Sequence, residues 1–317
     1  ALSERTVNPT LSENSEPPHA SAADSVPGLD LVAVDRWARR RAASSPWLHE
    51  EIASRKLPRL EFFRQLPVSW LHWEPVQGGL LAHRQLLQRL PDAQSHVLAQ
   101  DPQTALQAVN GVRRASWNPL RRKNPSAALL ANEQTRVGML WANMLLHMEP
   151  RPLALLQRWN RHIDTGGFLM FSCLGPDSLS ELRVLYRQRG WGEPTHGYVD
   201  MHDWGDLLVR AGFAEPVVDM EHITLTYSSA QAMLDELRLL GRNFHRDRFA
   251  GLRGRHWRQQ LVESIESTLP RGPDGRIRLG LEVIYGHAFK PEPRLKASPQ
   301  QSVSVDAMRD MLRSSRR

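Results

Sequence analysis

The stretch VSWLHWEPVQGGLLAHRQLLQRLPDAQSHVLAQD, residues 68–101, decides the fold. Its apolar run at 68–73 predicts a strand. Residues 80–90 repeat apolar side chains at helical spacing and predict a helix that ends at Pro91. Residues 96–100 predict a second strand. A strand, a helix and a strand in this order are the unit of a parallel sheet, because parallel strands need a crossover connection.

The same alternation continues toward both ends of the chain. Apolar runs predict further strands at 137–146, 168–174, 217–227 and 279–289, with a turn at 164–167. Helical spacing appears at 151–163, 203–211 and 230–240. Upstream, Pro46 is placed as the first residue of a helix with Ser45 as its cap. The pattern predicts an α/β protein whose parallel sheet is covered by helices on both faces.

Composition narrows the class of protein. The chain has 317 residues with 41% hydrophobic and 24% charged residues, which is typical of a globular domain. No run of 18 apolar residues predicts a membrane span. Cys173 is the single cysteine, so neither an intramolecular disulfide nor a thiolate metal cluster is expected, and a reducing cytoplasm is favoured. The net charge of +7 indicates either an acidic partner or an arginine-rich composition without functional meaning.

Domain organisation follows from local composition. Residues 1–29 are rich in Ser, Pro, Glu and Ala and predict a disordered segment. Residues 30–290 predict one domain, and 291–317 a flexible basic tail. Basic runs at Arg113–Arg114 and at 121–123 could dock an acidic carrier protein, meet nucleic acid, or form a solvated loop. Nucleic acid is the least favoured, because no aromatic RNA-binding signature accompanies the runs.

Four segments, residues 140–183, 198–227, 236–255 and 281–289, resemble the malonyl-acyl carrier protein O-methyltransferases of biotin synthesis. The resemblance implies a class I S-adenosylmethionine (SAM) methyltransferase fold, which is Rossmann-like, with a seven-strand sheet and helices on both faces. It also implies methylation of the free carboxylate of malonyl-acyl carrier protein, which lets fatty-acid synthesis elongate the unit as if it were apolar. The resemblance extends to a mitochondrial assembly factor. The alternative is therefore an inactive methyltransferase-fold protein that acts as a binding or assembly partner.

The resemblance assigns cofactor residues by position. The family pattern D-L-G-C-G-T-G aligns with residues 74–80, where Glu74 and Gly78 are kept and Val76 and Leu80 replace glycines. Asp101 aligns with the acid that accepts both ribose hydroxyls, a task that suits a carboxylate. The family usually has an Asp near the adenine before the fourth strand, and residues 117–134 contain no Asp. Asn143 ends the fourth strand and is expected to face the cleft. If the protein is instead an inactive member of the fold, the loop is an ordinary strand-to-helix turn that does not bind SAM, and Asp101 is a helix cap.

The implied reaction needs little chemistry from the protein. A carboxylate is already ionised at neutral pH, so no catalytic general base is expected, and catalysis is mainly positioning and desolvation. A cation must hold the malonyl group, and the candidates are Arg183 and the segment with Arg242 and His245. Trp47 lies where the family often has a lid tyrosine. Asp203, beside His202, is expected to cap a helix, and no metal site is predicted.

Overall fold

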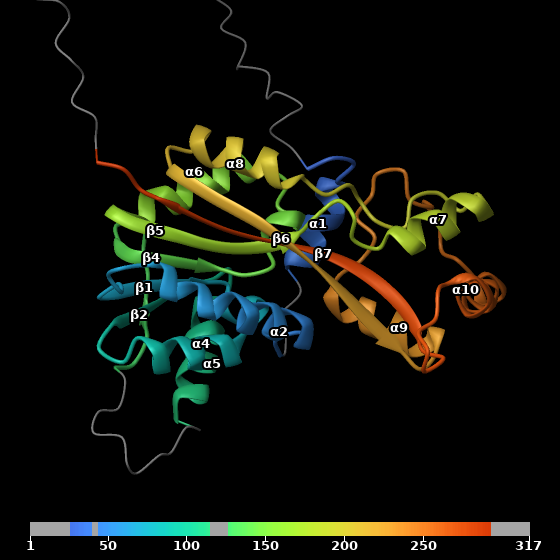
Figure 1. Cartoon of the computed structure of the whole chain (residues 1–317), viewed down its shortest axis with the longest axis horizontal. Coiled ribbons are helices and arrows are strands. Elements are labelled where there is room, and N and C mark those ends of the chain that lie inside the picture. Colours follow the sequence, from blue (N-terminus) through green and yellow to red (C-terminus); the bar gives the residue numbers. More distant parts are fainter. Residues whose placement is uncertain (1–25, 40–43, 115–125, 293–317) are drawn as a thin grey trace, which may run out of the picture.

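The computed structural model describes residues 26–39, 44–114 and 126–292, and builds them around one seven-stranded sheet. The strand order is β3-β2-β1-β4-β5-β7-β6, with β7 antiparallel to β5 and β6 and the other pairs parallel (Figure 1). The strands are β1 Ser69–Trp73, β2 Gln94–Leu98, β3 Leu129–Leu130, β4 Val137–Ala142, β5 Ile163–Leu174, β6 Ala214–Tyr227 and β7 Ile277–Phe289.

Helices cover both faces of the sheet, as the alternation predicted. In Figure 1, α6 and α8 lie on one side and α2, α4 and α5 on the other. A lobe of α7, α9 and α10 extends past the sheet along β6 and β7. The helices are α1 Leu31–Ala38, α2 Trp47–Lys56, η2 Leu57–Phe62, α3 Pro75–Gly78, α4 Leu80–Arg89, α5 Pro102–Arg114, η3 Leu146–Met148, α6 Pro152–His162, α7 Ser180–Arg189, α8 Met201–Arg210, α9 Ala230–Leu240 and α10 Arg255–Thr268.

Strand register places the ends of three strands at one edge. Trp73, the last residue of β1, pairs with Leu98 at the end of β2 and with Ala142 at the end of β4. The segments that follow these strands therefore emerge side by side. Ligands of open α/β sheets bind at this carboxyl edge.

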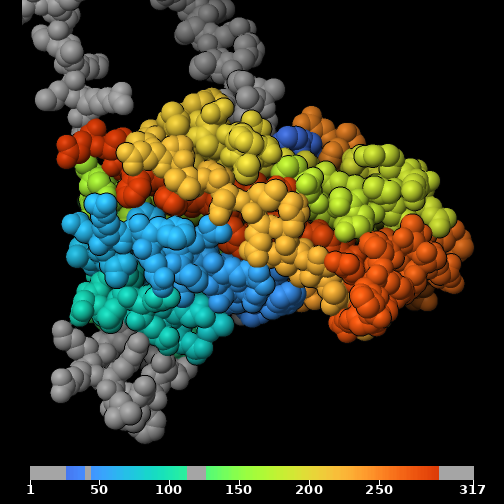
Figure 2. Space-filling model, in the orientation of Figure 1, coloured from blue at the N-terminus to red at the C-terminus, as the bar shows by residue number. Residues whose placement is uncertain are grey.

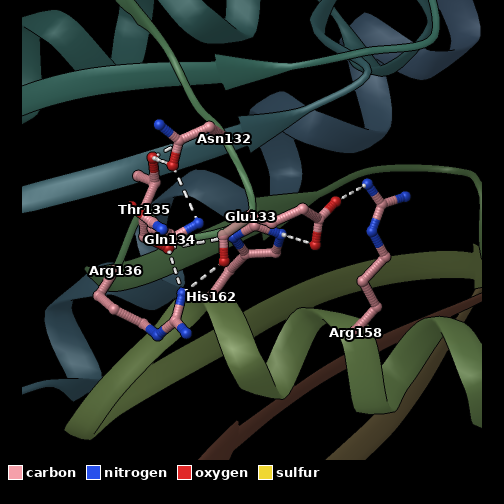
Figure 3. A network of polar contacts seen from close by, with 7 residues as sticks. All are labelled: Asn132, Glu133, Gln134, Thr135, Arg136, Arg158 and His162. Carbon is pink, nitrogen blue, oxygen red and sulfur yellow. Dashed lines mark hydrogen bonds and ion pairs between the residues drawn. The ribbon is translucent and has the colours of Figure 1, made fainter.

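The opposite end of β4 is fixed by a polar network around the turn that precedes it (Figure 3). Glu133 pairs with Arg158 of α6 at 2.6 Å, and Nδ1 of His162 lies 3.1 Å from the carbonyl oxygen of Thr135. Asn132 accepts from the backbone N–H of Gln134. This network lies at the amino end of β4, so its role is to anchor the strand.

Three local expectations differ from the structure. Residues 164–167, expected as a turn, belong to β5, because Gly166 and Gly167 exchange backbone hydrogen bonds with Lys290. Asp200, rather than Asp203, caps α8 by accepting from the N–H of His202 at 2.8 Å. The third difference concerns the predicted helix cap at residue 45, whose hydroxyl bonds to another helix, as described below.

The first described residues belong to the core. Val26 and Leu29, which fall inside the segment predicted to be disordered, are buried with the helices on the α6 side of the sheet. Asp30 caps α1 and forms a 2.7 Å ion pair with Arg248. Within the described residues, no helix combines the length and the apolar character needed to span a bilayer.

Candidate active site

The glycine loop follows β1 at the carboxyl edge. Glu74 adopts a left-handed conformation, with φ of 51°, and turns the chain into the short helix α3. Its carboxylate accepts from the N–H of Gln100 at 2.6 Å, and its own N–H donates to the carbonyl oxygen of Leu98. Burial raises the pKa of Glu74, and the charge of Asp101 raises it further. Glu74 therefore ties the end of β1 to the end of β2.

Asp101 lies near Glu74, because β1 and β2 are parallel neighbours that end side by side. Its carboxylate also caps α5, because it accepts from the backbone N–H of Thr104 at 3.3 Å and from the Thr104 hydroxyl at 2.9 Å. Both interpretations of Asp101 thus have a geometric basis. The edge carries two neighbouring carboxylates, which are acceptors for hydroxyl groups.

Asn143 follows β4 and is fully buried. Its amide nitrogen donates to the carbonyl oxygen of Gly78 at 2.6 Å and to that of His49 at 2.8 Å. Its amide oxygen accepts from the hydroxyl of Ser172 at 2.6 Å. The structure thus brings Gly78 and Asn143 together, but in this conformation the Asn143 amide holds the loop against α2 instead of facing an open cleft.

The start of α2 closes over the glycine loop through side chains that sequence reasoning did not single out for this role. The carboxylate of Glu50 accepts from the N–H groups of Leu81 and Ala82, each at 2.9 Å, at the first turn of α4. The hydroxyl of Ser45, expected to cap α2, accepts from the N–H of Leu80 at 2.9 Å. Nδ1 of His49 lies 2.8 Å from the carbonyl oxygen of Gln77.

Two buried polar atoms at the loop have no partner within the described residues. They are Nε2 of Gln77, in the loop itself, and Nε2 of His72. A Cβ added at Gly78 would lie 3.1 Å from that His72 atom. Buried polar atoms usually have a hydrogen-bond partner, so the loop retains unused capacity for a polar ligand.

A cavity of about 550 Å³ lies beside α2, and His49 and His147 are among the buried residues that line it. His49 links the cavity to the glycine loop, because it is also the residue bonded to Gln77. The cavity walls are apolar, with leucines from α7, α9 and α10 together with Tyr186 and Trp257. Of the described residues that line it, five are arginines and none is an aspartate or a glutamate. The arginines are Arg238, Arg242, Arg253, Arg255 and Arg258.

The cavity also has a polar wall, which His147, His196 and Tyr198 line. Nε2 of His196 lies 2.7 Å from the carbonyl oxygen of His147. Burial lowers the pKa of both histidines, to about 4 for His196, so both are neutral at neutral pH. Nδ1 of each ring is buried without a partner in the described part of the chain. Tyr198 completes this wall through its hydroxyl, which bonds to Thr195.

The predicted substrate residues fall into two groups. Arg242 lines the cavity and stacks 4.9 Å from the Trp37 ring, and Arg183 lies behind the polar wall, donating to the carbonyl oxygen of His196 at 3.2 Å. His245 and Trp47 are not among the cavity-lining residues described. His245 instead accepts from the N–H of Asp247, and Trp47 begins α2 with 48% of its surface exposed.

Comparison with known proteins places these features in a family. No family model matches the chain. The malonyl-[acyl-carrier protein] O-methyltransferase of Gallionella capsiferriformans is 36% identical over 287 residues, which cover 84% of this chain and 95% of the relative. The protein of that name from Nitrosospira multiformis is 33% identical over 264 residues, covering 78% and 84%.

A solved structure agrees on the fold. The YcgJ protein of Bacillus subtilis superimposes with a TM-score of 0.50 at 10% identity, covering 76% of this chain and all of that one. The strand order, with its antiparallel β7, and the curated relatives together define a Rossmann-like class I SAM methyltransferase fold. By its similarity to full-length relatives across most of its own length, this chain belongs to the malonyl-[acyl-carrier protein] O-methyltransferase family.

Proposed function

We propose that this protein transfers a methyl group from SAM to the free carboxylate of malonyl-acyl carrier protein. The observation that carries the proposal is the cavity beside the glycine loop, which five arginines and no carboxylate line among the described residues. An apolar cavity with only positive charge favours a small apolar chain that carries an anion. Malonyl thioester is such a group.

The residues at the carboxyl edge fit the cofactor. Glu74 and Asp101 offer neighbouring acceptors for ribose hydroxyls, and the side-chain nitrogens of Gln77 and His72 that lack a partner among the described residues leave polar capacity at the loop. When bound, SAM supplies an electrophilic methyl group on a sulfonium. The backbone N–H groups at the start of α4 are held by Ser45 and Glu50. Binding of a cofactor carboxylate at those groups would require the start of α2 to withdraw.

The chain's own contribution to the reaction is positioning. A malonyl carboxylate is ionised at neutral pH and needs no base. In this proposal Arg242, which lines the cavity, orients the carboxylate, and the neutral rings of His147 and His196 leave the arginines as the source of positive charge. The leucine walls supply apolar contact for the thioester chain. The product ester is uncharged, so its attraction to the arginines is weaker than that of the substrate.

The alternative is an inactive member of the fold that serves as a binding or assembly partner. The observation that favours it is the glycine loop, where Val76 and Leu80 replace glycines and the first turn of α4 is already capped by Glu50. We place it second, because an assembly surface gives no reason for an arginine-lined cavity next to that loop.

Calorimetric titration of the full chain with SAM and with S-adenosylhomocysteine separates the two functions. The enzyme hypothesis predicts saturable binding of both, weakened by Asp101→Asn, which replaces one of the two acceptor oxygens with a donor. Thr104→Val is the matched control, since it removes a contact of Asp101 and keeps the carboxylate. Absence of binding to the folded wild-type chain would contradict the proposed function and favour the alternative.

A further inference from the structure

An unusually basic part of the chain lines one side of the cavity. Residues 238–258, here called the arginine segment, contain seven arginines and a single acidic residue, Asp247. The segment runs from the end of α9 to the first turn of α10. Its arginines therefore account for most of the excess positive charge of a protein whose net charge is +7.

Some of these arginines have structural tasks. Arg248 pairs with Asp30, and Arg253 stacks on the rings of Trp257 and Phe249 and donates to the carbonyl oxygen of Trp191. Others are exposed and form no ion pair within the described residues, namely Arg238, Arg246 and Arg255. Their charge is available to a partner.

Exposed apolar side chains lie in the same segment. Leu252 is fully exposed at 102%, and Phe249 is 55% exposed beside Arg253. Arginine and aromatic side chains are enriched at protein interfaces, and large exposed apolar side chains in a charged setting mark interaction surfaces. The segment thus combines charge with exposed apolar side chains in the same stretch of chain as the cavity-lining Arg253 and Arg255.

We propose that the arginine segment is the surface on which an acidic acyl carrier protein docks. The inference rests on the proposed function and specifies where the partner binds. Arg238, Arg242 and Arg255 belong to both the cavity lining and the arginine segment, so a carrier docked on this segment holds its thioester group next to the cavity. Arg113–Arg114, where the other basic run begins, are the last residues of α5, a helix that lies away from α10 in Figure 1. In Figure 2 the lobe that carries α10, coloured orange-red, projects as an end of its own.

Two double charge reversals test the location. Arg246→Glu with Arg255→Glu alters the arginine segment, and Arg113→Glu with Arg114→Glu makes the same change of charge at the end of α5. Binding of the full chain to holo-acyl carrier protein without a malonyl group is measured by fluorescence anisotropy at low and moderate salt. We expect the first variant to weaken binding at low salt by about tenfold or more, to flatten the salt dependence and to keep the wild-type melting temperature. The second is expected to bind as the wild type does.

Replacement of one exposed apolar side chain, Leu252→Ser, tests the apolar contact with the carrier. It is expected to weaken carrier binding several-fold without altering the salt dependence. An equal loss of carrier affinity in both charge-reversal variants, or a loss only in the α5 variant, would overturn the assignment of the docking surface to the arginine segment. Because the carrier here has no malonyl group, the result is independent of methyl transfer. If the carrier binds through the arginine segment but no methyl group is transferred, only the proposed function is contradicted. If methyl transfer is unaffected by the charge reversal in the arginine segment, only the docking surface is contradicted.

Discussion

The contact between Glu50 and the first turn of α4 allows a sharp prediction. Its carboxylate accepts two backbone N–H groups at 2.9 Å, so Glu50→Ala removes a helix cap supplied from another helix. Loss of such a cap costs about 0.5–2 kcal/mol, and loss of the negative charge at the helix N-terminus about 0.3–1 kcal/mol more. A sum of about 1–3 kcal/mol corresponds to a fall of roughly 3–9 °C in melting temperature for a domain of this size.

Glu51→Ala is the matched control, one residue along the same helix. Glu51 pairs with Arg55 on an exposed face, a contact worth about 0.3–0.5 kcal/mol, so a shift of only about 1 °C is expected. A thermal melt monitored by circular dichroism measures both. Equal shifts in the two variants would refute the assignment of Glu50 as the clamp of the loop.

Gly79→Ala adds a second test of the same contact. Gly79 has φ of 127°, and a Cβ there would lie 2.7 Å from Oε2 of Glu50. In the Glu50→Ala background that neighbour is gone and only the backbone strain and a 3.2 Å approach to Ala82 remain. The glycine substitution should therefore cost at least about 0.5 kcal/mol less there than in the wild type. Additive effects would show that the loop and α2 are not coupled.

Three further predictions concern stability and reactivity. Burial lowers the pKa of His72 and His83 below 6.5, to about 3 for His83, so below pH 6.5 the folded state binds fewer protons than the unfolded state. The free energy of unfolding should therefore fall by up to about 1.4 kcal/mol per histidine for each pH unit below 6.5. A melting temperature that rises as the pH is lowered from 7.5 to 5.5 would contradict this. Cys173 is buried and its thiol pKa is raised, so iodoacetamide should label it only after denaturation, and rapid native labelling would argue against its position. Removing the residues before Val26 should leave the melting temperature within about 2 °C of the wild-type value. Removing the residues through Leu29 should lower it by at least about 4 °C, because the buried side chains of Val26 and Leu29 are lost. Equal effects of the two truncations would contradict the place of these side chains in the core.

The sequence predicted the sheet well, because the period of buried residues in strands and helices is a local property. The helix expected at 80–90 is α4, and the strand expected at 217–227 forms most of β6. Predictions from the local sequence were wrong where a segment distant in the chain supplied the hydrogen-bond partner. The hydroxyl of Ser45 reaches Leu80 instead of its own helix, and Gly166–Gly167 extend β5 because Lys290 pairs with them.

The site was predictable to the extent that it depends on strand ends. Glu74 and Asp101 lie together because β1 and β2 are parallel neighbours, a consequence of the strand-helix-strand order. The cavity was not predictable, since α7, α9 and α10 come together only through their packing on β6 and β7. Of residues 238–258 the sequence singled out Arg242 and His245, and only the fold shows that five arginines of this segment line one cavity.

Transfer of a labelled methyl group from SAM to malonyl-acyl carrier protein tests the central claim most directly, with acetyl-acyl carrier protein as the matched substrate that lacks the carboxylate. The wild-type chain is expected to place a base-labile methyl ester on the malonyl group and no label on the acetyl group, and Arg242→Gln is expected to raise the KM for malonyl-acyl carrier protein. Equal labelling of both carriers, or no labelling of the malonyl carrier by a folded chain that binds SAM, would contradict the account.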